Sequence, residues 1–208
     1  MVDLKALADA IIKGDQNTAV KITNAALAEK MAPGNILNKG LIAGMDVIGV
    51  RFRNNEVYIP EVLIAARAMK SAMEILEPEL VKAGVKPAGK LLIGTVQGDL
   101  HDIGKNLVAM MLKGAGFKVV DLGVDIPVEQ FVERAKAERV QLIGMSALLT
   151  TTMPSMEKTV KALKEAGVTA KVMIGGAPVT QSYADRIGAH GYAPDAASAV
   201  DLAKSLVA

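Results

Sequence analysis

The chain has 208 residues, of which 51% are hydrophobic, 22% are charged and 3% are aromatic, and its formal net charge is +2; this is the composition of a globular protein with one large domain or two small ones. The few aromatic residues, the lack of Trp and the dispersed Lys and Arg argue against a nucleic-acid-binding or membrane-surface protein. The lack of Cys excludes disulfides, zinc–thiolate sites and iron–sulfur clusters, and without an apolar signal core or a run of about 20 apolar residues we expect a cytoplasmic location.

Residues 1–84 are predicted to form a four-helix bundle. Apolar residues recur at helical spacing in four stretches, which are residues 4–11, 20–31, 37–52 and 62–76. Pro33-Gly34 closes the second stretch, and Asn54-Asn55 closes the third. Pro60 suits the first turn of the fourth helix. Four helices with short connections pack as a small bundle.

A linker containing glycine and proline, residues 83–89, precedes a change of pattern. From residue 90 onward, short apolar runs without clean alternation are followed by helical stretches, which indicates a parallel sheet covered on both faces. The predicted strands are residues 90–96, 118–122, 141–146, 171–174 and, weakly, 191–193; the predicted helices are residues 104–115, 128–138, 154–166, 179–187 and 196–207. Residues 90–208 are therefore predicted to form an α/β domain with a doubly wound five-stranded parallel sheet.

A ligand of such a sheet is expected beside the point where the strand order reverses, outside the carboxyl ends of the strands. In the order 2-1-3-4-5 this point lies between strands 1 and 3, with strand 4 alongside. Three loops are therefore of interest, which are residues 98–106, 146–152 and 175–178. All three carry small, polar or glycine residues that a sheet alone does not require.

His101, in the first of these loops, is the candidate metal ligand. An isolated histidine is more often a surface or capping residue, but the Asp99 carboxylate can accept a hydrogen bond from one ring nitrogen and leave the other nitrogen for a metal. Asp102 is expected to cap the following helix. A bare metal ion would require further ligands beside His101, whereas the other histidine, His190, is distant in the sequence.

One axial histidine is enough where a macrocycle supplies the other ligands, and both haem and corrin meet that description. Haem pockets are commonly helical and rich in aromatic residues. A histidine at the edge of a sheet, beside glycine and hydroxyl loops, suits a corrinoid better. Gly175-Gly176 is consistent with a tight turn, or with a channel through which a slim ligand enters the sheet edge.

These residues resemble a known family, the cobalamin-binding module of methionine synthase and the small corrinoid proteins of methylamine, methanol and methoxyarene methyltransferase systems. The shared signature is Asp-x-His-x-x-Gly, then Ser-x-Leu, then Gly-Gly, at matching spacings. In this chain the signature begins with Asp99, His101 and Gly104, continues with Ser146 and Leu148, and ends with Gly175-Gly176. The resemblance covers nearly the whole chain and implies a flavodoxin-like cobalamin-binding domain preceded by a helical cap.

The resemblance also implies roles for individual residues. The expected corrinoid contacts in the α/β domain are Asp99, His101, Asp102, Ile103, Gly104, Ser146, Leu148, Thr150, Gly175, Gly176, Tyr192 and Ala196. His101 would bind cobalt, while Asp99 and Thr152 would extend it into a hydrogen-bonded relay, with threonine where methionine synthase has serine. In the cap, Phe52, Ile59 and Val62 would lie against the methyl-bearing face, and packing within the bundle is the alternative for all three.

The implied function is that of a methyl carrier, whose cobalt(I) accepts a methyl group in one partner and yields it in another. The partners would be a donor-specific methyltransferase, an acceptor methyltransferase that uses tetrahydrofolate or a thiol, and a reductive activase. Two rivals share the histidine loop, namely the corrinoid subunit of a carbon-skeleton mutase and a cobalamin-dependent sensor. The mutase subunit generally lacks the cap, and the sensor usually adds a DNA-binding segment. An α/β domain without a cofactor also stays open.

Overall fold

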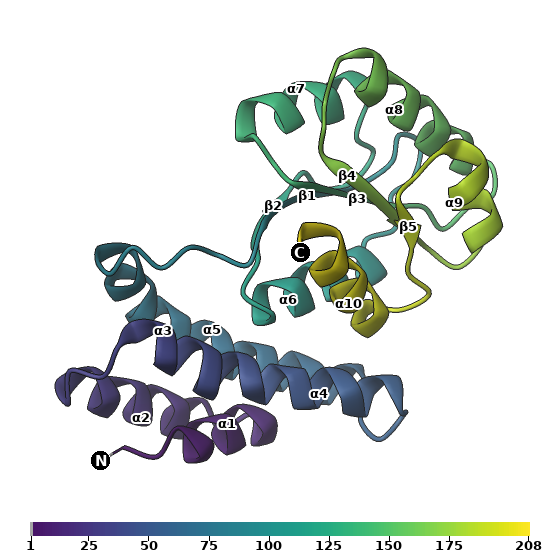
Figure 1. Ribbon diagram of the computed structural model, residues 1–208. Coiled ribbons are helices and arrows are strands. Elements are labelled where there is room, and N and C mark those ends of the chain that lie inside the picture. The colour runs from purple at the N-terminus through teal and green to yellow at the C-terminus, as the bar shows by residue number, and fades with distance from the viewer. Residues whose placement is uncertain (1) are drawn as a thin grey trace. The chain divides into compact units, whose positions relative to one another are not determined.

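The computed structural model describes residues 2–208 (Figure 1). The chain divides into two compact units: a helical unit, which comprises the residues up to Pro87 together with Gly114–Gly116, and an α/β unit, which comprises Ala88–Lys113 and Phe117–Ala208. None of the helices among residues 2–208 combines the length and the apolar character that crossing a bilayer requires.

The helical unit contains the four predicted helical stretches, one of which is composite. Its elements are α1 (Leu4–Lys13), α2 (Gln16–Ala28), α3 (Pro33–Asn35), the π-helix η1 (Ile36–Ile42), α4 (Ala43–Arg53) and α5 (Ile59–Lys82). Asp3 and Asp15 start the first two helices, since their carboxylates accept hydrogen bonds from the first-turn N–H groups of Lys5 and Thr18. Gly14 ends α1 at a φ of 68°, which glycine adopts readily.

The third stretch is helical without a break through α3, η1 and α4, and its first part is a π-helix rather than a regular α-helix. The packing of this stretch on α1 is close. A Cβ atom on Gly40 would lie 2.5 Å from a methyl carbon of Leu7, and one on Gly44 would lie 2.8 Å from the carbonyl oxygen of Ala8. Glycine at both positions therefore lets the two backbones approach.

Gly44→Ala is expected to destabilise the helical unit by about 1–3 kcal/mol because the added Cβ would meet Ile11 Cβ at 2.7 Å as well as the Ala8 carbonyl. This loss should outweigh the gain in helix propensity, about 1 kcal/mol. Gly34→Ala is the matched control, since its Cβ would make only an ordinary contact of 3.6 Å with Val85. Urea denaturation measures both free energies of unfolding, and equal values would contradict the close approach.

The α/β unit contains the predicted five-stranded parallel sheet, in the predicted order β2-β1-β3-β4-β5. The strands are β1 (Lys90–Thr95), β2 (Lys118–Asp121), β3 (Leu142–Ser146), β4 (Lys171–Gly175) and β5 (Gly191–Tyr192). The intervening helices are α6 (Ile103–Gly114), α7 (Val128–Glu138), α8 (Met153–Glu165), α9 (Gln181–Ile187) and α10 (Ala196–Val207). The doubly wound fold class is confirmed, because parallel strands require crossover helices of this kind.

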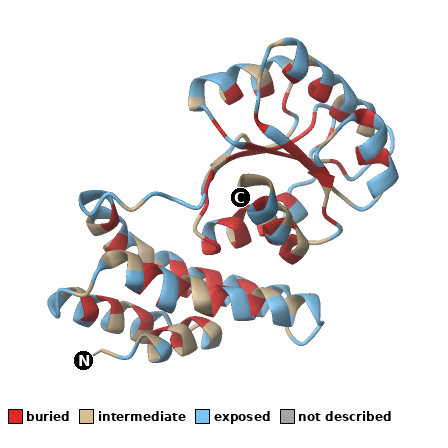
Figure 2. Cartoon of the chain, viewed as in Figure 1, coloured by how far each residue is buried: buried red, intermediate tan, exposed pale blue. Residues whose placement is uncertain are grey.

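Helices cover both faces of the sheet. Figure 1 shows α7, α8 and α9 on one face and α6 and α10 on the other. Figure 2 shows a buried sheet between the buried inner faces of these helices. Phe131 of α7, completely buried, packs in the core with strand residues such as Leu92 and Ile143. This apolar burial, worth about 25 cal/mol per Å², fixes the strands whose ends form the site described next.

Candidate functional site

The ends of three neighbouring strands lie side by side. Thr95, the last residue of β1, pairs with Ser146, the last residue of β3, and Ser146 pairs in turn with Gly175, the last residue of β4. The loops that follow these strands therefore leave the sheet at the same edge. This is the edge at which the sequence predicted a ligand.

Asp99 and His101 are hydrogen-bonded to each other. Asp99 Oδ1 accepts a hydrogen bond from the backbone N–H of His101, at 3.0 Å. The same oxygen lies 2.7 Å from the ring nitrogen Nδ1 of His101. The carboxylate of Asp99 is completely buried, whereas the ring of His101 is 51% exposed. A proton on Nδ1 leaves Nε2 with a free lone pair, so the exposed nitrogen is the one available to a metal.

The second oxygen of Asp99 is held by the loop after β3. Oδ2 accepts hydrogen bonds from the backbone N–H of Leu148, at 2.7 Å, and from the hydroxyl of Thr152, at 2.8 Å. Burial alone would raise the pKa of Asp99, but the hydrogen bonds from His101, Leu148 and Thr152 outweigh it and hold the pKa well below its usual value. Asp99 is thus an ionised acceptor that joins two of the three loops.

The Thr152 hydroxyl lies between two acceptors, because its oxygen is 2.8 Å from both Asp99 Oδ2 and the carbonyl oxygen of Leu149. A hydroxyl has one proton and can donate to only one of them at a time. The contact that the predicted relay requires is present in this geometry. The role of Thr152 in such a relay stays a prediction.

Thr152→Val is expected to lower the free energy of unfolding by about 1 kcal/mol, since it removes a buried hydrogen bond to Asp99 with little change of shape. Leu149 loses little, because its carbonyl oxygen also accepts from the backbone N–H groups of residues 152 and 153. Thr152→Ser keeps the hydroxyl and should stay close to the parent protein. Urea denaturation compares the three proteins, and equal losses in both variants would contradict this account.

Exposed apolar residues flank His101 in its own loop and in the β3 loop that Asp99 joins to it. We use the term apolar rim for Leu100, Ile103, Leu148 and Leu149, which are large apolar side chains with exposures of 71%, 76%, 43% and 43%. A Cβ atom on Gly104 would meet nothing within 4 Å, so the start of α6 is open as well. One histidine nitrogen beside an exposed apolar rim fits a broad, largely apolar ligand that needs a single axial donor. The residues present therefore fit a corrinoid.

Gly176 adopts a φ of 131°, which is a glycine-only conformation. A Cβ atom at this position would lie 1.8 Å from the carbonyl oxygen of Ala147. The β4 loop can therefore approach the β3 loop closely only because residue 176 has no side chain. A channel at this point, into which Ser146 would face, stays a prediction.

The remaining predicted contact residues are distributed as follows. Asp102, Ile103 and Thr150 are exposed, Ser146 and Tyr192 are partly buried, and Ala196, the first residue of α10, is buried. Asp102 accepts a hydrogen bond on its carboxylate from the side chain of Asn106, at 2.9 Å. In the helical unit Ile59 is exposed, Phe52 is partly buried and Val62 is completely buried.

Sequence reasoning missed an ion pair beside the histidine loop. Lys105 is 3% exposed, and its ammonium group donates to both carboxylate oxygens of Asp121, at 2.7 and 2.6 Å. The available signal was a lysine on the apolar face of α6, since Lys105, Ala109 and Leu112 recur at helical spacing and are all buried. A buried lysine requires a partner, and Asp121 at the end of β2 supplies it.

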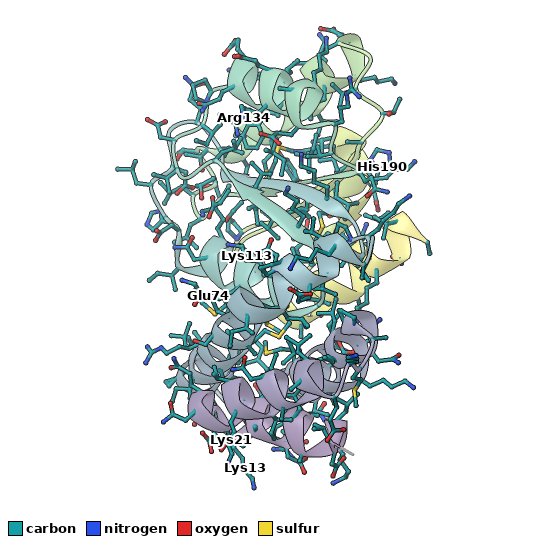
Figure 3. The ribbon with its side chains drawn as sticks, turned by 90° about the vertical axis from the view of Figure 1, so that its left-hand side faces the viewer. Lys13, Lys21, Glu74, Lys113, Arg134 and His190 are labelled. Carbon is teal, nitrogen blue, oxygen red and sulfur yellow. The ribbon has the colours of Figure 1, made fainter. Side chains whose placement is uncertain are left out.

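The second histidine, His190, lies at the other end of the sheet; Figure 3 labels it beside the strands. Its Nδ1 accepts a hydrogen bond from the backbone N–H of Val172, near the start of β4, at 3.0 Å. Burial, followed by the nearby charge of Lys171, lowers the pKa of His190. His190 is thus a structural acceptor, distant from His101.

Comparison with known proteins agrees with this geometry. Two family models match, both described as a B12 binding domain: one over residues 89–201 and the other over residues 3–77. Trimethylamine corrinoid protein 1 of Methanosarcina acetivorans is 44% identical over 203 residues, which are 96% of this chain and 94% of that protein. Dimethylamine corrinoid protein 3 of the same organism is 43% identical over an alignment of 213 positions, which covers 100% of both chains.

Solved structures agree. A cobalamin-binding protein from Desulfitobacterium hafniense DCB-2 superposes with a TM-score of 0.83 at 33% identity, over 100% of both chains. The methanol:cobalamin methyltransferase complex of Methanosarcina barkeri contains a chain that superposes with a TM-score of 0.87 at 29% identity, over 98% of this chain and 79% of that one. The family model over residues 89–201 spans more than half of the sequence, and the relatives are alike from end to end. This chain belongs to the family of B12-binding-domain proteins.

Proposed function

We propose that this chain is a corrinoid methyl carrier, which accepts a methyl group from a donor-specific methyltransferase and passes it to a second methyltransferase. The observation that carries the proposal is the end-to-end likeness to trimethylamine and dimethylamine corrinoid proteins. A domain that bound B12 for another purpose would need to resemble these relatives only over residues 89–201, the part that the first B12-binding family model matches. The match over residues 3–77 extends the likeness to the helical part.

His101 would hold the corrinoid through its cobalt. When bound, the corrinoid supplies a cobalt atom that can take up and release a methyl group. His101 would offer Nε2 to the cobalt, because Asp99 accepts the hydrogen bond from Nδ1. The buried Asp99 carboxylate keeps its negative charge, so it remains an acceptor for the Nδ1 proton. The Asp99 contact would thereby determine which nitrogen of His101 is available to the cobalt.

The apolar rim would contact the underside of the macrocycle, and the loops after β3 and β4 would accept its nucleotide tail. Residues 90–208 form the cofactor-binding domain in this proposal, and residues 1–84 form a cap over the methyl-bearing face. Ile59, which is exposed, is the best placed of the predicted cap contacts to touch a ligand. Val62, which is completely buried, serves the packing of the cap.

The partners in this proposal are the two methyltransferases and a reductive activase. A donor of the methylamine class agrees with the names of the relatives. Donor recognition itself belongs to the partner methyltransferase, because the carrier offers only the corrinoid. A methyltransferase encoded beside this gene would therefore be the one to combine with the purified carrier.

The test is reconstitution followed by transfer. The purified chain is incubated with hydroxocobalamin, and we expect a coloured complex with one corrinoid per chain. Isotope-labelled methylamine and the neighbouring methyltransferase should then label the carrier, and a second methyltransferase should move the label to a thiol or to tetrahydrofolate. Failure of correctly folded protein to take up a corrinoid would overturn the proposal, and uptake without labelling by any methylamine would overturn the donor class.

A further inference from the structure

The histidine loop, residues 97–102, is held by a second loop that comes from a different part of the chain. This holding loop, residues 122–127, connects β2 to α7 and continues the sheet beyond the end of β2. Ile126 donates its backbone N–H to the carbonyl oxygen of Thr95, at 3.0 Å, and forms a parallel bridge with Val96. The holding loop thus runs directly beside the point where the histidine loop begins.

Asp125, in the holding loop, makes two hydrogen bonds to the histidine loop, and we call these two bonds the Asp125 grip. Its side-chain Oδ1 accepts a hydrogen bond from the backbone N–H of Gly98, at 2.7 Å. Its backbone N–H donates to the carbonyl oxygen of Asp99, at 3.0 Å. The two bonds fix the peptide group before Gly98 and the one after Asp99, and so hold the backbone on both sides of this residue pair, whose Asp99 side chain orients His101.

Asp125 adopts a left-handed backbone conformation, with a φ of 54°. Among residues other than glycine, Asp and Asn enter this region most readily, and doing so costs on the order of 1 kcal/mol. The conformation turns the backbone N–H and the side-chain oxygen of one residue toward the same loop. Within the described residues, the carboxylate of Asp125 has no ion pair, so its short bond to Gly98 is the interaction that stands out.

The other end of the histidine loop has its own anchor. The buried hydroxyl of Thr95 donates to the carbonyl oxygen of His101, at 2.9 Å. His101 is therefore fixed by Thr95 at its own carbonyl, and through Asp99 by Asp125. Asp99 cannot compensate for a shift of the loop, because its other oxygen is tied to Leu148 and Thr152.

We propose that Asp125 is a positioning residue, which sets the position and orientation of the His101 ring by holding the backbone of Gly98 and Asp99. The inference rests on the proposed function, in which His101 is the lower ligand of a corrinoid. A ring held in place before binding needs no reordering when it ligates, whereas a loose loop must be ordered at that moment. Loss of the Asp125 grip therefore favours the state in which His101 is detached.

Three variants separate the grip from the backbone conformation. Asp125→Gly removes the side-chain acceptor but adopts the left-handed conformation easily. Asp125→Asn keeps both an acceptor oxygen and the tolerance of that conformation. Arg139→Gly is the matched control, since Arg139 also has a left-handed backbone, with a φ of 49°, and lies at the end of α7, away from the histidine loop.

The first readout uses the protein without cofactor. Hydrogen exchange of the Gly98 amide should accelerate roughly fivefold to tenfold in Asp125→Gly, as expected for the loss of one hydrogen bond. Asp125→Asn and Arg139→Gly should exchange at the rate of the parent protein. Nuclear magnetic resonance of ¹⁵N-labelled histidine should show His101 as the tautomer protonated at Nδ1 in the parent protein, and a mixture of tautomers in Asp125→Gly.

The second readout uses the protein loaded with cobalamin and reduced to cobalt(II). One ligating histidine nitrogen splits each cobalt line threefold in the electron paramagnetic resonance spectrum, and ¹⁵N-histidine changes the threefold pattern to a twofold one. In Asp125→Gly the ratio of ligated to detached His101 should fall about fivefold, with rescue in Asp125→Asn. Equal ratios in the parent and in Asp125→Gly would overturn the positioning role of Asp125 and leave the proposed function standing. A parent protein without histidine splitting would overturn the proposed function, and the role of Asp125 with it.

Discussion

His101→Ala is expected to lower the rate of methyl transfer by more than about 100-fold, because changes one shell further from a metal already cost 10-fold to 100-fold. Uptake of corrinoid should weaken but persist, since the apolar rim of Leu100, Ile103, Leu148 and Leu149 remains. The transfer of isotope-labelled methyl groups through the complete system measures the rate, and absorbance measures uptake. Undiminished transfer would remove His101 from the mechanism.

Asp99→Asn tests the control of His101 separately from its presence. Asp99 accepts bonds from His101 on one oxygen and from the Leu148 backbone and Thr152 on the other. Asparagine has a single oxygen, so its NH₂ group must face an N–H donor on one side or the other. We expect a loss of about 1–3 kcal/mol in the free energy of unfolding and a 10-fold to 100-fold slower transfer.

The stability difference between the parent protein and Asp99→Asn should depend on pH. The pKa of Asp99 is lower in the folded chain than its ordinary value of 3.8. The contribution of its charge is therefore fully present above that ordinary value, and it is lost as the pH falls toward the folded pKa. Unfolding midpoints from pH 7 to pH 2 should converge at the acid end, and a constant difference would contradict the assigned ionisation.

Asp102→Asn is the matched control for the two stability measurements. Asp102 belongs to the same loop and is exposed, and its carboxylate accepts one bond, from the side chain of Asn106, at 2.9 Å. An amide oxygen can accept that bond, so stability should change by less than about 0.5 kcal/mol. Similar losses in the variants of Asp99 and Asp102 would indicate a general effect of negative charge rather than the specific role of Asp99.

Gly176→Ala is expected to destabilise the protein by more than about 4 kcal/mol, or to prevent folding. The added Cβ would lie 1.8 Å from the carbonyl oxygen of Ala147 and 2.9 Å from its carbonyl carbon, and these are backbone atoms of the β3 loop. Relief of the clash would move Ala147, and with it the Leu148 N–H that binds Asp99. A folded remnant should therefore also lose corrinoid uptake.

Gly167→Ala separates the effect of backbone conformation from the clash. Gly167 has a φ of 69°, and a Cβ atom there would meet nothing within 4 Å. Left-handed alanine costs on the order of 1 kcal/mol. Circular dichroism and urea denaturation compare the two variants. A loss in Gly176→Ala no larger than that in Gly167→Ala would show that the β4 loop can move away from Ala147.

The α/β half could be predicted from the sequence because each of its elements follows a local rule. Short unbroken apolar runs such as residues 142–146 indicate buried parallel strands, and the strand order then fixes the edge at which His101 lies. Periodicity also gave the helical half its extent. It did not predict η1, because the choice between an α- and a π-helix depends on how Gly40 and Gly44 pack against α1.

The surroundings of the site could not be predicted, because they depend on contacts between residues far apart in the chain. The burial of Lys105 requires Asp121, which belongs to the neighbouring strand. The grip of Asp125 on Gly98 spans 27 residues and pairs a side chain with a backbone group, for which a single sequence has no pattern. The complete burial of Asp99, and its bond from the backbone N–H of Leu148, likewise depend on a residue 49 positions away.

The span between Asp99 and Thr152 also has a consequence for how the protein is made. Their hydrogen bond joins residues 53 positions apart. His101 donates to the buried carboxylate from its own loop, and the other donors all lie beyond β3. A nascent chain on the ribosome that ends before β3 has the histidine loop but not the partners of Asp99. Long-range parallel pairing forms late, and isolated halves of a domain do not fold independently. A corrinoid would therefore meet the complete Asp99–His101 arrangement only once the chain through Thr152 has been made and folded.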